Sequence, residues 1–490
     1  MARIQLTFTC AALAVVGIAS AQSAGLKLSP TNLLPKAWGN TYKATIRSKY
    51  LNETRTVNLF VPASFNTTKR KYPVIFLSDG EYNFEAAAVA SYELEQSGHI
   101  PECIVAAIET PHRTQDLTPP GMGKFLAEGE EKGEKFLQFI SKELRPALDL
   151  KLRSSNPNVL VGHSHGGILA HYAAATHRKE FPFILALDAP MHLENAWLVK
   201  KLDSSLQSGG NLRLVSLENR FGWQDADWNS FVSSAPKSWH LFRQKLSNET
   251  HQSMVFSGLY LGLEQLFGDF SVASVKDMSA PRAYAHYESL VKDYGAFVTP
   301  PQDVLQRAVD EITITGDGAA AHRALNALSN GYGPPENFDA MSKRIDVAAA
   351  KMKGQPSVDE LQSMPKPTEE EMKPFLGIWD GTTTVEDGPT IHVTVSFSMK
   401  DGHAVGALTM HAPADEGGDH TEELSYIKVQ PNGIDFGFLN GIFPQAIVDH
   451  MGRLKNGKLV GTQKFAGVYF VPIFGEPLPK WSFSLEHRNS

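Results

Sequence analysis

Apolar residues in the first half of this chain form short continuous runs separated by amphipathic stretches. Continuous runs of this length are typical of strands buried on both faces of a mostly parallel sheet. The intervening stretches repeat apolar residues at helical spacing. Together they predict an α/β fold. The strand runs are 56–61, 74–77, 104–108, 159–161, 184–187 and 212–217, and the helical stretches are 136–150, 168–177 and 256–267.

The pattern changes twice further along the chain. Residues 273–365 repeat apolar positions at helical spacing, which predicts a helical connector region. A Pro- and Glu-rich stretch near 362–371 is typical of a linker. Beyond it, residues 372–490 alternate apolar and polar positions between Asn-Gly and Asp-Gly pairs, which favour hairpin turns. We therefore expect an α/β domain at 26–272, the connector, and a C-terminal antiparallel β-barrel or sandwich.

The N-terminus has the features of a secretory signal peptide. Arg3 supplies a positive charge, residues 10–18 form an apolar run too short to span a membrane, and residues 19–21 are small. We expect cleavage after about residue 21 and a periplasmic or extracellular protein. Cys103 would then be the remaining cysteine, so the mature chain would have no internal disulfide.

Composition excludes several classes of partner. The formal net charge is -7 over 490 residues, which gives no electrostatic footprint for nucleic acid. No segment after the N-terminus is long and apolar enough to span a membrane. His411, Asp419 and His420 lie in an acidic, glycine-rich stretch that we expect to be solvated rather than metal-binding. We expect no metal and no cofactor, and the sequence leaves the oligomeric state open.

One motif carries candidate chemistry. The segment Gly162–Gly166 reads Gly-His-Ser-His-Gly, directly after an apolar run and directly before a helical pattern. A G-x-S-x-G motif in this setting predicts a sharp strand-to-helix turn that exposes the serine hydroxyl. We therefore interpret Ser164 as a nucleophile, with a purely structural turn as the alternative.

A serine nucleophile needs a general base, which an acidic residue orients. Chain order places that histidine after the last core strand, and His251 fits best. The histidines that flank the serine are expected to point away from the approach to its hydroxyl. Glu218, at the end of the run 212–217, is the expected acid, and Asp225 is the alternative.

The negatively charged oxygen that forms during ester cleavage needs positioned N–H donors. The backbone N–H of His165, immediately after the serine, is one candidate. The second is expected from the loop after the strand run 74–77, where the sequence reads Ser-Asp-Gly-Glu-Tyr. We assign it to the backbone N–H of Glu81, with Gly80 as the alternative.

These segments also carry a family resemblance. In order and spacing, the chain resembles the Putative esterase branch of the α/β-hydrolases, which includes esterase D-like and enterochelin esterase-related proteins. The resemblance covers about residues 40–270. It implies serine-dependent cleavage of carboxylic esters without a metal or cofactor, with Ser164, His251 and Glu218 as the triad. The segments that carry it are 76–81, 112–119, 162–166, 188–191 and 249–253; the segment 188–191 departs from the Ser-Pro-Ser more usual in the family.

The sequence thus predicts an exported serine hydrolase that cleaves a small-molecule or conjugated ester. The branch includes siderophore, phenolic and acetyl-sugar esterases, so the resemblance names no substrate. Two other functions remain open. An acyltransferase would use the same triad with an alcohol in place of water, and a non-catalytic binding protein would keep only the fold.

Overall fold

The computed structural model describes the chain in two compact units. Unit 1 comprises the chain up to residue 67 together with 71–273 and 290–298, and unit 2 comprises 68–70, 274–289 and 299–490. The expected signal peptide at 1–21 lies outside the described residues. Those residues are 25–122, 129–207, 209–271, 279–296, 298–386, 388–412, 418–439, 446–466 and 480–488.

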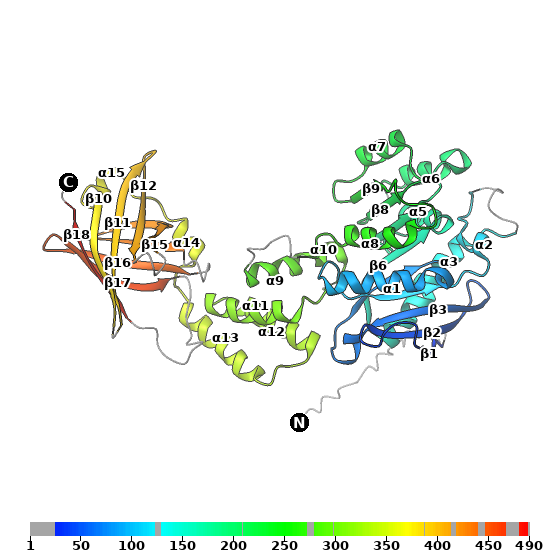
Figure 1. Ribbon diagram of the computed structural model, residues 1–490, viewed down its shortest axis with the longest axis horizontal. Helices are drawn as coiled ribbons and strands as arrows, with labels where there is room; N and C mark the ends of the chain where they lie inside the picture. The colour runs from blue at the N-terminus through cyan, green and yellow to red at the C-terminus, as the bar shows by residue number, and fades with distance from the viewer. Residues whose placement is uncertain are drawn as a thin grey trace, which may run out of the picture. The chain divides into compact units, whose positions relative to one another are not determined.

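A mixed sheet forms the centre of unit 1 (Figure 1). Within the described residues it has nine strands in the order β1-β2-β3-β5-β4-β6-β7-β8-β9. The pairs β1–β2, β2–β3 and β3–β5 are antiparallel, and the strands from β5 to β9 run parallel. The strands are β1 (Lys27–Thr31), β2 (Gly39–Ser48), β3 (Glu53–Pro62), β4 (Tyr72–Leu77), β5 (Ile104–Ile108), β6 (Ser154–His163), β7 (Phe183–Leu187), β8 (Arg213–Glu218) and β9 (His240–Lys245).

Helices cover both faces of this sheet. Helices α1 and α8 pack against each other. Helix α1 also packs on β3, β4 and β5, and α8 packs on β7 and β8. Helix α5 packs on β6 and β7 and contacts α2 and α6. A short 3-10 helix (Ala63–Asn66) follows β3, and a π-helical turn (Ile140–Leu144) joins α3 to α4. The α-helices are α1 (Gly80–Gln96), α2 (Arg113–Leu117), α3 (Gly133–Phe139), α4 (Arg145–Leu152), α5 (His165–Thr176), α6 (Leu193–Ser204), α7 (Asp225–Ser234), α8 (Met254–Leu266) and α10 (Val291–Tyr294).

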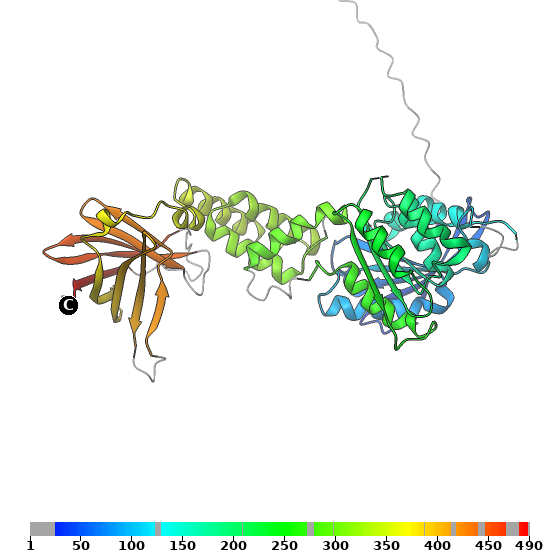
Figure 2. The ribbon, with the colours of Figure 1, turned by 90° about the horizontal axis from the view of Figure 1, so that it is seen from above.

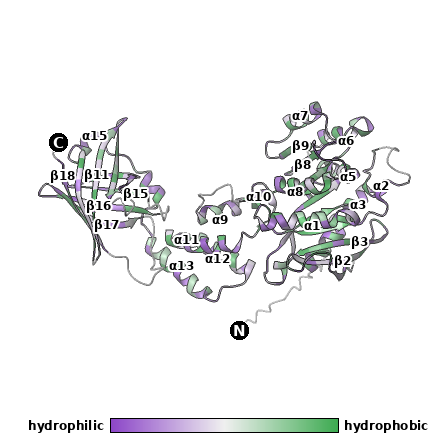
Figure 3. Ribbon diagram, viewed as in Figure 1, coloured by the Kyte–Doolittle hydropathy of each residue, from purple (hydrophilic) through white to green (hydrophobic). Residues whose placement is uncertain are grey.

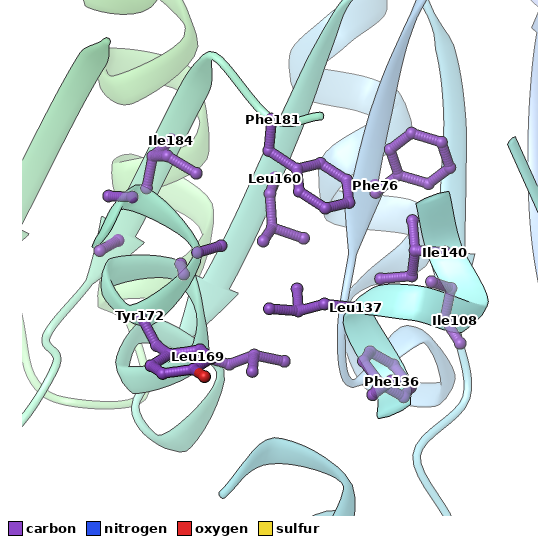
Figure 4. Packing of buried hydrophobic residues seen from close by; sticks show 14 of the residues in the cluster. Phe76, Ile108, Phe136, Leu137, Ile140, Leu160, Leu169, Tyr172, Phe181 and Ile184 are labelled. Atoms are coloured by element: carbon purple, nitrogen blue, oxygen red, sulfur yellow. The ribbon is translucent and has the colours of Figure 1, made fainter. Parts of the chain in front are cut away.

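The core of unit 1 explains why the apolar runs became central strands. Every residue of β4, β5 and β7 is buried, as a strand covered on both faces requires. In Figure 3, hydrophobic residues, coloured green, occur within the sheet of unit 1. In Figure 4, Leu160 of β6 and Ile184 of β7 lie toward Leu169 of α5, while the rings of Phe76 and Phe181 meet edge to face at 6.1 Å. The predicted α/β fold is confirmed.

The first part of unit 2 is helical, as the spacing of apolar residues predicts (Figure 2). Helices α9, α11, α12 and α13 bury one face each, and Leu305, Val309 and Leu325 lie at their common centre. The side chain of Asp317 caps α12 by accepting the N–H of Ala320. The helices are α9 (Ala280–Ser289), α11 (Gln302–Thr315), α12 (Gly318–Tyr332), α13 (Phe338–Met352), α14 (Val358–Gln362) and α15 (Glu369–Met372).

The rest of unit 2 is an antiparallel sheet curled into a half-barrel (Figure 1). Its described strands form one sheet in the order β13-β12-β11-β10-β18-β17-β16-β15-β14, so β10 pairs with the last strand. The antiparallel C-terminal domain is therefore confirmed, and it is a single curled sheet rather than a sandwich. The strands are β10 (Gly377–Val385), β11 (Thr390–Lys400), β12 (His403–His411), β13 (His420–Glu423), β14 (Tyr426–Gln430), β15 (Gly433–Leu439), β16 (Ile447–Lys455), β17 (Lys458–Ala466) and β18 (Trp481–His487).

The half-barrel has an apolar core of its own, in which Val395, Phe397, Phe436 and Phe483 are buried. On another part of the same sheet, Leu361 of α14 packs against Tyr426 and nearby apolar side chains. In the described parts of the chain, no helix combines the length and the apolar character that crossing a membrane requires.

Candidate active site

The strand-to-helix turn at Ser164 has the predicted geometry. Strand β6 ends at His163, α5 begins at His165, and Ser164 between them has φ 58° and ψ -114°. A non-glycine residue with positive φ is strained and persists only where its surroundings hold it. Here the N–H of Ser164 donates to Leu187 O at 2.9 Å, and the Ile168 N–H donates to Ser164 O at 3.1 Å.

Glycines permit this turn because the backbone passes close to itself. A Cβ added at Gly162 would lie 1.9 Å from Gly166 O, and one at Gly166 would lie 2.3 Å from Ser78 Oγ. A Cβ at Gly167 would lie 2.8 Å from Ala189 Cβ. Gly162 therefore needs glycine because the clash is with the backbone, and a side chain at Gly166 or Gly167 would displace Ser78 or Ala189, as expected of a strained turn that presents a serine.

His251 lies on the loop between β9 and α8, and its ring is held on several sides. Its Nδ1 is 2.6 Å from Asp188 Oδ2. The ring of Phe221 meets it edge to face, with centroids 5.2 Å apart, and the ring of His163 lies 4.4 Å away. Because a carboxylate accepts hydrogen bonds, Nδ1 carries the proton and Nε2 is left as the basic nitrogen.

Asp188 is built to orient that imidazole. It follows β7 directly, is fully buried, and has a positive φ of 46°. Its Oδ1 accepts the backbone N–H groups of Asn219 and Phe221 at 2.9 and 2.8 Å, which leaves Oδ2 for His251. Burying a carboxylate without hydrogen-bond donors is costly, so these donors stabilise Asp188 in its buried position and also fix its orientation.

The expectation that Glu218 orients His251 is corrected by these contacts. Glu218 ends β8 as predicted, but its carboxylate binds the guanidinium of Arg243 on the neighbouring strand β9. Burial raises the pKa of Glu218, and Arg243 partly offsets that effect. The alternative acid, Asp225, binds the same Arg243 at 2.7 Å and is largely exposed. Arg243 on β9 thus pairs with both Glu218 and Asp225, whereas the carboxylate that contacts His251 is that of Asp188.

Both histidines that flank Ser164 have defined partners. His163 is buried, and its Nε2 lies 2.7 Å from the main-chain oxygen of His251. The Nδ1 of His165 accepts from Arg113 Nη1 at 3.1 Å. Burial, followed by the nearby charge of Arg113, lowers the pKa of His165. His163 therefore turns toward the base rather than away from the site, contrary to expectation.

Arg113, in the first turn of α2, connects two loops of the site. Its guanidinium binds Asp79 through Nε and Nη2 at 2.7 and 2.9 Å. It also donates through Nη2 to His163 O at 3.3 Å and through Nη1 to the His165 ring at 3.1 Å. Asp79 has φ 56° and is the residue that precedes α1. Arg113 thus ties the loop before α1 to the turn around Ser164.

The two expected oxyanion donors lie in the first turns of helices. His165 begins α5, and Glu81 is the second residue of α1. The side-chain carboxylate of Glu81 accepts the Thr110 N–H at 3.1 Å. The first backbone N–H groups of a helix have no partner within the helix. Strands β4 and β6, which precede these helices, are parallel neighbours with Leu77 opposite Val161. Both helix starts are therefore at the same edge of the sheet.

A cavity of about 710 Å³ opens over this edge. Ser164, His251 and His163 line it together with Arg113 and Asp79. Residues of α1 and of the start of α8 form its walls; they include two large, exposed aromatic side chains, Tyr82 and Phe256. The candidate nucleophile and base therefore face one solvent-accessible space large enough for a small ester group.

Two site residues were missed from the sequence: Asp188 and Arg113. Asp188 directly follows β7 and Arg113 begins the helix after β5, so their positions offered a signal, but Glu218 at the end of β8 offered the same one. Carboxylates at the carboxyl ends of adjacent strands are equivalent by sequence position alone, because their side-chain partners come from distant segments.

Among the described residues, no three His, Cys, Asp or Glu side chains are grouped as a metal would require.

Comparison with known proteins defines the class of this domain. Residues 48–247 match the family model described as Putative esterase. The predicted resemblance to the Putative esterase family is therefore confirmed for residues 48–247, and the mostly parallel α/β sheet of unit 1 agrees with it.

Similar proteins include two from fungi and one from a bacterium. The chain is 30% identical over 132 residues to a siderophore triacetylfusarinine C esterase of Aspergillus fumigatus, covering 24% of this chain and 44% of the relative. It is 34% identical over 95 residues to a siderophore enterobactin esterase of Emericella nidulans, covering 17% and 31%. The chain therefore spans less than half the length of these relatives. A solved IroE-like serine hydrolase from Shewanella oneidensis is 26% identical, with a TM-score of 0.48 and coverage of 62% and 99%.

Proposed function

We propose that this protein is a serine hydrolase of carboxylic esters that uses Ser164, His251 and Asp188. The observation that carries the proposal is the contact between His251 Nδ1 and the fully buried Asp188, beside a cavity that Ser164 also lines. A buried carboxylate that fixes the tautomer of a histidine next to a strained serine has the arrangement of a catalytic triad. Glu218 has no part in the proposed mechanism, because its partner is Arg243.

In the proposed mechanism, Ser164 Oγ attacks the carbonyl carbon of the ester while His251 Nε2 accepts its proton. Asp188 stabilises the resulting imidazolium through Nδ1–H. Collapse of the tetrahedral intermediate breaks the bond to the alcohol, which takes the proton from His251 and leaves an acyl-serine. Water then attacks the acyl group with His251 again as base, which releases the acid and restores the serine.

The negative charge on the tetrahedral intermediate needs donors. We assign one to the His165 backbone N–H and keep the Glu81 N–H as the second candidate. Arg113 is a further candidate, because it lines the cavity and its position is fixed by Asp79. A guanidinium carries five N–H donors, and a second N–H on Nη1 remains beside the one that binds His165.

Two finer assignments belong to this proposal. The relatives named as siderophore esterases make siderophore esters reasonable first substrates to assay. Export through the signal peptide predicts a mature N-terminus near residue 22, which N-terminal sequencing of the protein secreted from its host would locate. Transfer to an alcohol in place of water remains the alternative reaction, and product analysis with added alcohol distinguishes the two.

Covalent labelling tests the nucleophile. A fluorophosphonate should add to the wild-type protein, and mass spectrometry should place the adduct on the peptide that contains Ser164. Ser164→Ala should lose the label and about 10⁶-fold in turnover of p-nitrophenyl butyrate, the loss typical when a triad nucleophile is removed. Ser233→Ala is the matched control, because Ser233 is exposed on α7 and donates to Ser230 O.

The outcomes separate the candidate functions. Wild-type turnover in folded Ser164→Ala would refute the mechanism. A folded wild-type protein that neither labels nor cleaves short esters, phenolic esters or siderophore esters would favour the non-catalytic binding function. Labelling with formation of a new ester from an added alcohol, faster than hydrolysis, would favour the acyltransferase.

A further inference from the structure

His163, the residue before the proposed nucleophile, has two separate contacts with the proposed base, His251. His163 is 8% exposed and is the last residue of β6. Its Nε2 lies 2.7 Å from the main-chain oxygen of His251, and the two imidazole rings lie 4.4 Å apart at an angle of 38°. The side chain thus contacts both the backbone and the ring of His251.

The direction of this hydrogen bond fixes the state of His163. A carbonyl oxygen only accepts, so Nε2 of His163 carries a proton and donates it. The groups that act electrostatically on the ring are His251 from the loop before α8, Arg113 from α2 and Asp79 from the loop before α1. Burial first, and then the charges of His251 and Arg113, lower the pKa of His163 to about 4, while the hydrogen bond to the His251 main chain and the charge of Asp79 act in the opposite direction. The imidazole is therefore neutral near pH 7.

A neutral donor at this place has a chemical advantage over a cation. During the proposed reaction His251 becomes positively charged when it accepts the proton of Ser164. A lysine or a protonated histidine 4.4 Å away would oppose that charge, whereas a neutral N–H donor holds the loop without repelling it. Asp188 fixes one nitrogen of His251, and His163 fixes its backbone, so the two contacts restrain different parts of the same residue.

We propose that His163 is a positioning residue for the general base: its Nε2–H, more than its ring face, holds His251 so that Nε2 of His251 faces Ser164. This inference rests on the proposed function, because it assigns His163 a role in that reaction. His163 does not touch the reacting atoms in this role. Loss of its contact should therefore reduce turnover more than substrate binding.

Two substitutions separate the N–H from the ring. His163→Phe keeps an aromatic face against His251 and loses the donor, whereas His163→Gln keeps an N–H donor of similar reach and loses the ring. We expect kcat of His163→Phe on p-nitrophenyl butyrate to fall about 10- to 100-fold with KM within about twofold, since small misplacements of catalytic groups have effects of this size. His163→Gln should recover most of the lost kcat.

The matched control is His171→Phe. His171 is also buried and neutral, and its Nδ1 contacts a main-chain oxygen, that of Gly167, at 2.9 Å. Within the described part of the chain, neither the hydrogen bonds nor the ring contacts of His171 involve His251. Its substitution should lower the melting temperature and leave kcat close to the wild-type value. A fall in kcat equal to that of His163→Phe would show that any buried histidine has the same effect, and would overturn the proposal.

A second measurement needs no turnover. The proton between His251 Nδ1 and Asp188 should give a far-downfield NMR signal that Asp188→Asn removes. We expect this signal to broaden or vanish in His163→Phe and to persist in His163→Gln. Should the Phe variant fail to fold, His163→Met, which also lacks the donor, takes its place in both assays.

The failure of this inference is distinguishable from failure of the proposed function. Wild-type kcat and an unchanged downfield signal in folded His163→Phe would overturn the role of His163, while Ser164-dependent hydrolysis would stand. Equal loss of kcat in the Phe and Gln variants would also overturn it, because the N–H would then have no separate effect. Absence of Ser164-dependent hydrolysis in the wild type would instead refute the function on which the inference rests.

Discussion

Replacing Asp188 with asparagine is the most direct test of the triad. The side chain keeps its shape, but one carboxylate oxygen becomes an NH₂ group. The structure determines which one, because the backbone N–H groups of Asn219 and Phe221 both donate to Oδ1 and need an acceptor there. These two donors hold the amide oxygen of the new side chain at the Oδ1 position, so the NH₂ group takes the place of Oδ2.

That orientation reverses the tautomer of His251. The new NH₂ group would donate to Nδ1 at the place where Asp188 Oδ2 now accepts, 2.6 Å away. The proton of the imidazole would then sit on Nε2, the nitrogen that must accept the proton of Ser164. A histidine held in the wrong tautomer costs a triad about 10⁴-fold in kcat. That factor corresponds to about 5.5 kcal/mol of transition-state stabilisation.

The comparison with Glu218 gives the test its control. Glu218→Gln weakens a buried contact with Arg243, which keeps Asp225 and Trp223 O as partners. We expect a loss of about 1.5–3 kcal/mol in unfolding free energy, the range for a hydrogen bond to a charged group, and a kcat close to that of the wild type. Asp225→Asn should change either quantity little, because its side chain is largely exposed.

The assay combines p-nitrophenyl butyrate turnover with urea unfolding for the three variants. Folded protein concentration comes from unfolding curves, because a weak enzyme titrates poorly with a covalent inhibitor. The reasoning is refuted if folded Asp188→Asn retains kcat within tenfold of the wild type. It is also refuted if Glu218→Gln loses more kcat than Asp188→Asn at matched folded fractions, which would return the role to Glu218.

Three further predictions concern pH, the turn and the C-terminal unit. Burial lowers the pKa of His171 to about 4, so the unfolding free energy should fall by about 1.4 kcal/mol per pH unit for this histidine as the pH drops from about 6.5 to 4. Urea unfolding should show a weaker dependence of unfolding free energy on pH in His171→Gln, and an equal dependence would contradict this prediction. Gly162→Ala should abolish turnover or folding, whereas Gly268→Ala, with no atom closer than 3.5 Å, should not. A chain ending near residue 365 should hydrolyse small esters at close to the full-length rate; a folded but inactive truncation would show that the C-terminal sheet completes the site.

Much of the fold was predictable because it depends on local patterns. Continuous apolar runs mark strands buried on both faces, and β4, β5 and β7 lie where such runs occur. The turn at Ser164 was also predictable, since a strained backbone needs glycines at short, fixed spacing. The antiparallel strand β2 and the last parallel strand β9 were not predicted, because polar residues interrupt them.

The partners of the charged side chains were decided by tertiary structure. By sequence, Asp188 directly after β7 and Glu218 at the end of β8 are equivalent carboxylates, because both lie between Ser164 and His251 in chain order. Pairing of β8 with β9 places Arg243 beside Glu218, whereas the N–H groups of the loop after β8 bind Asp188 and turn its free oxygen to His251. A buried charge is stable only next to its partner, and in a folded sheet that partner comes from another strand or loop, which one-dimensional spacing does not specify.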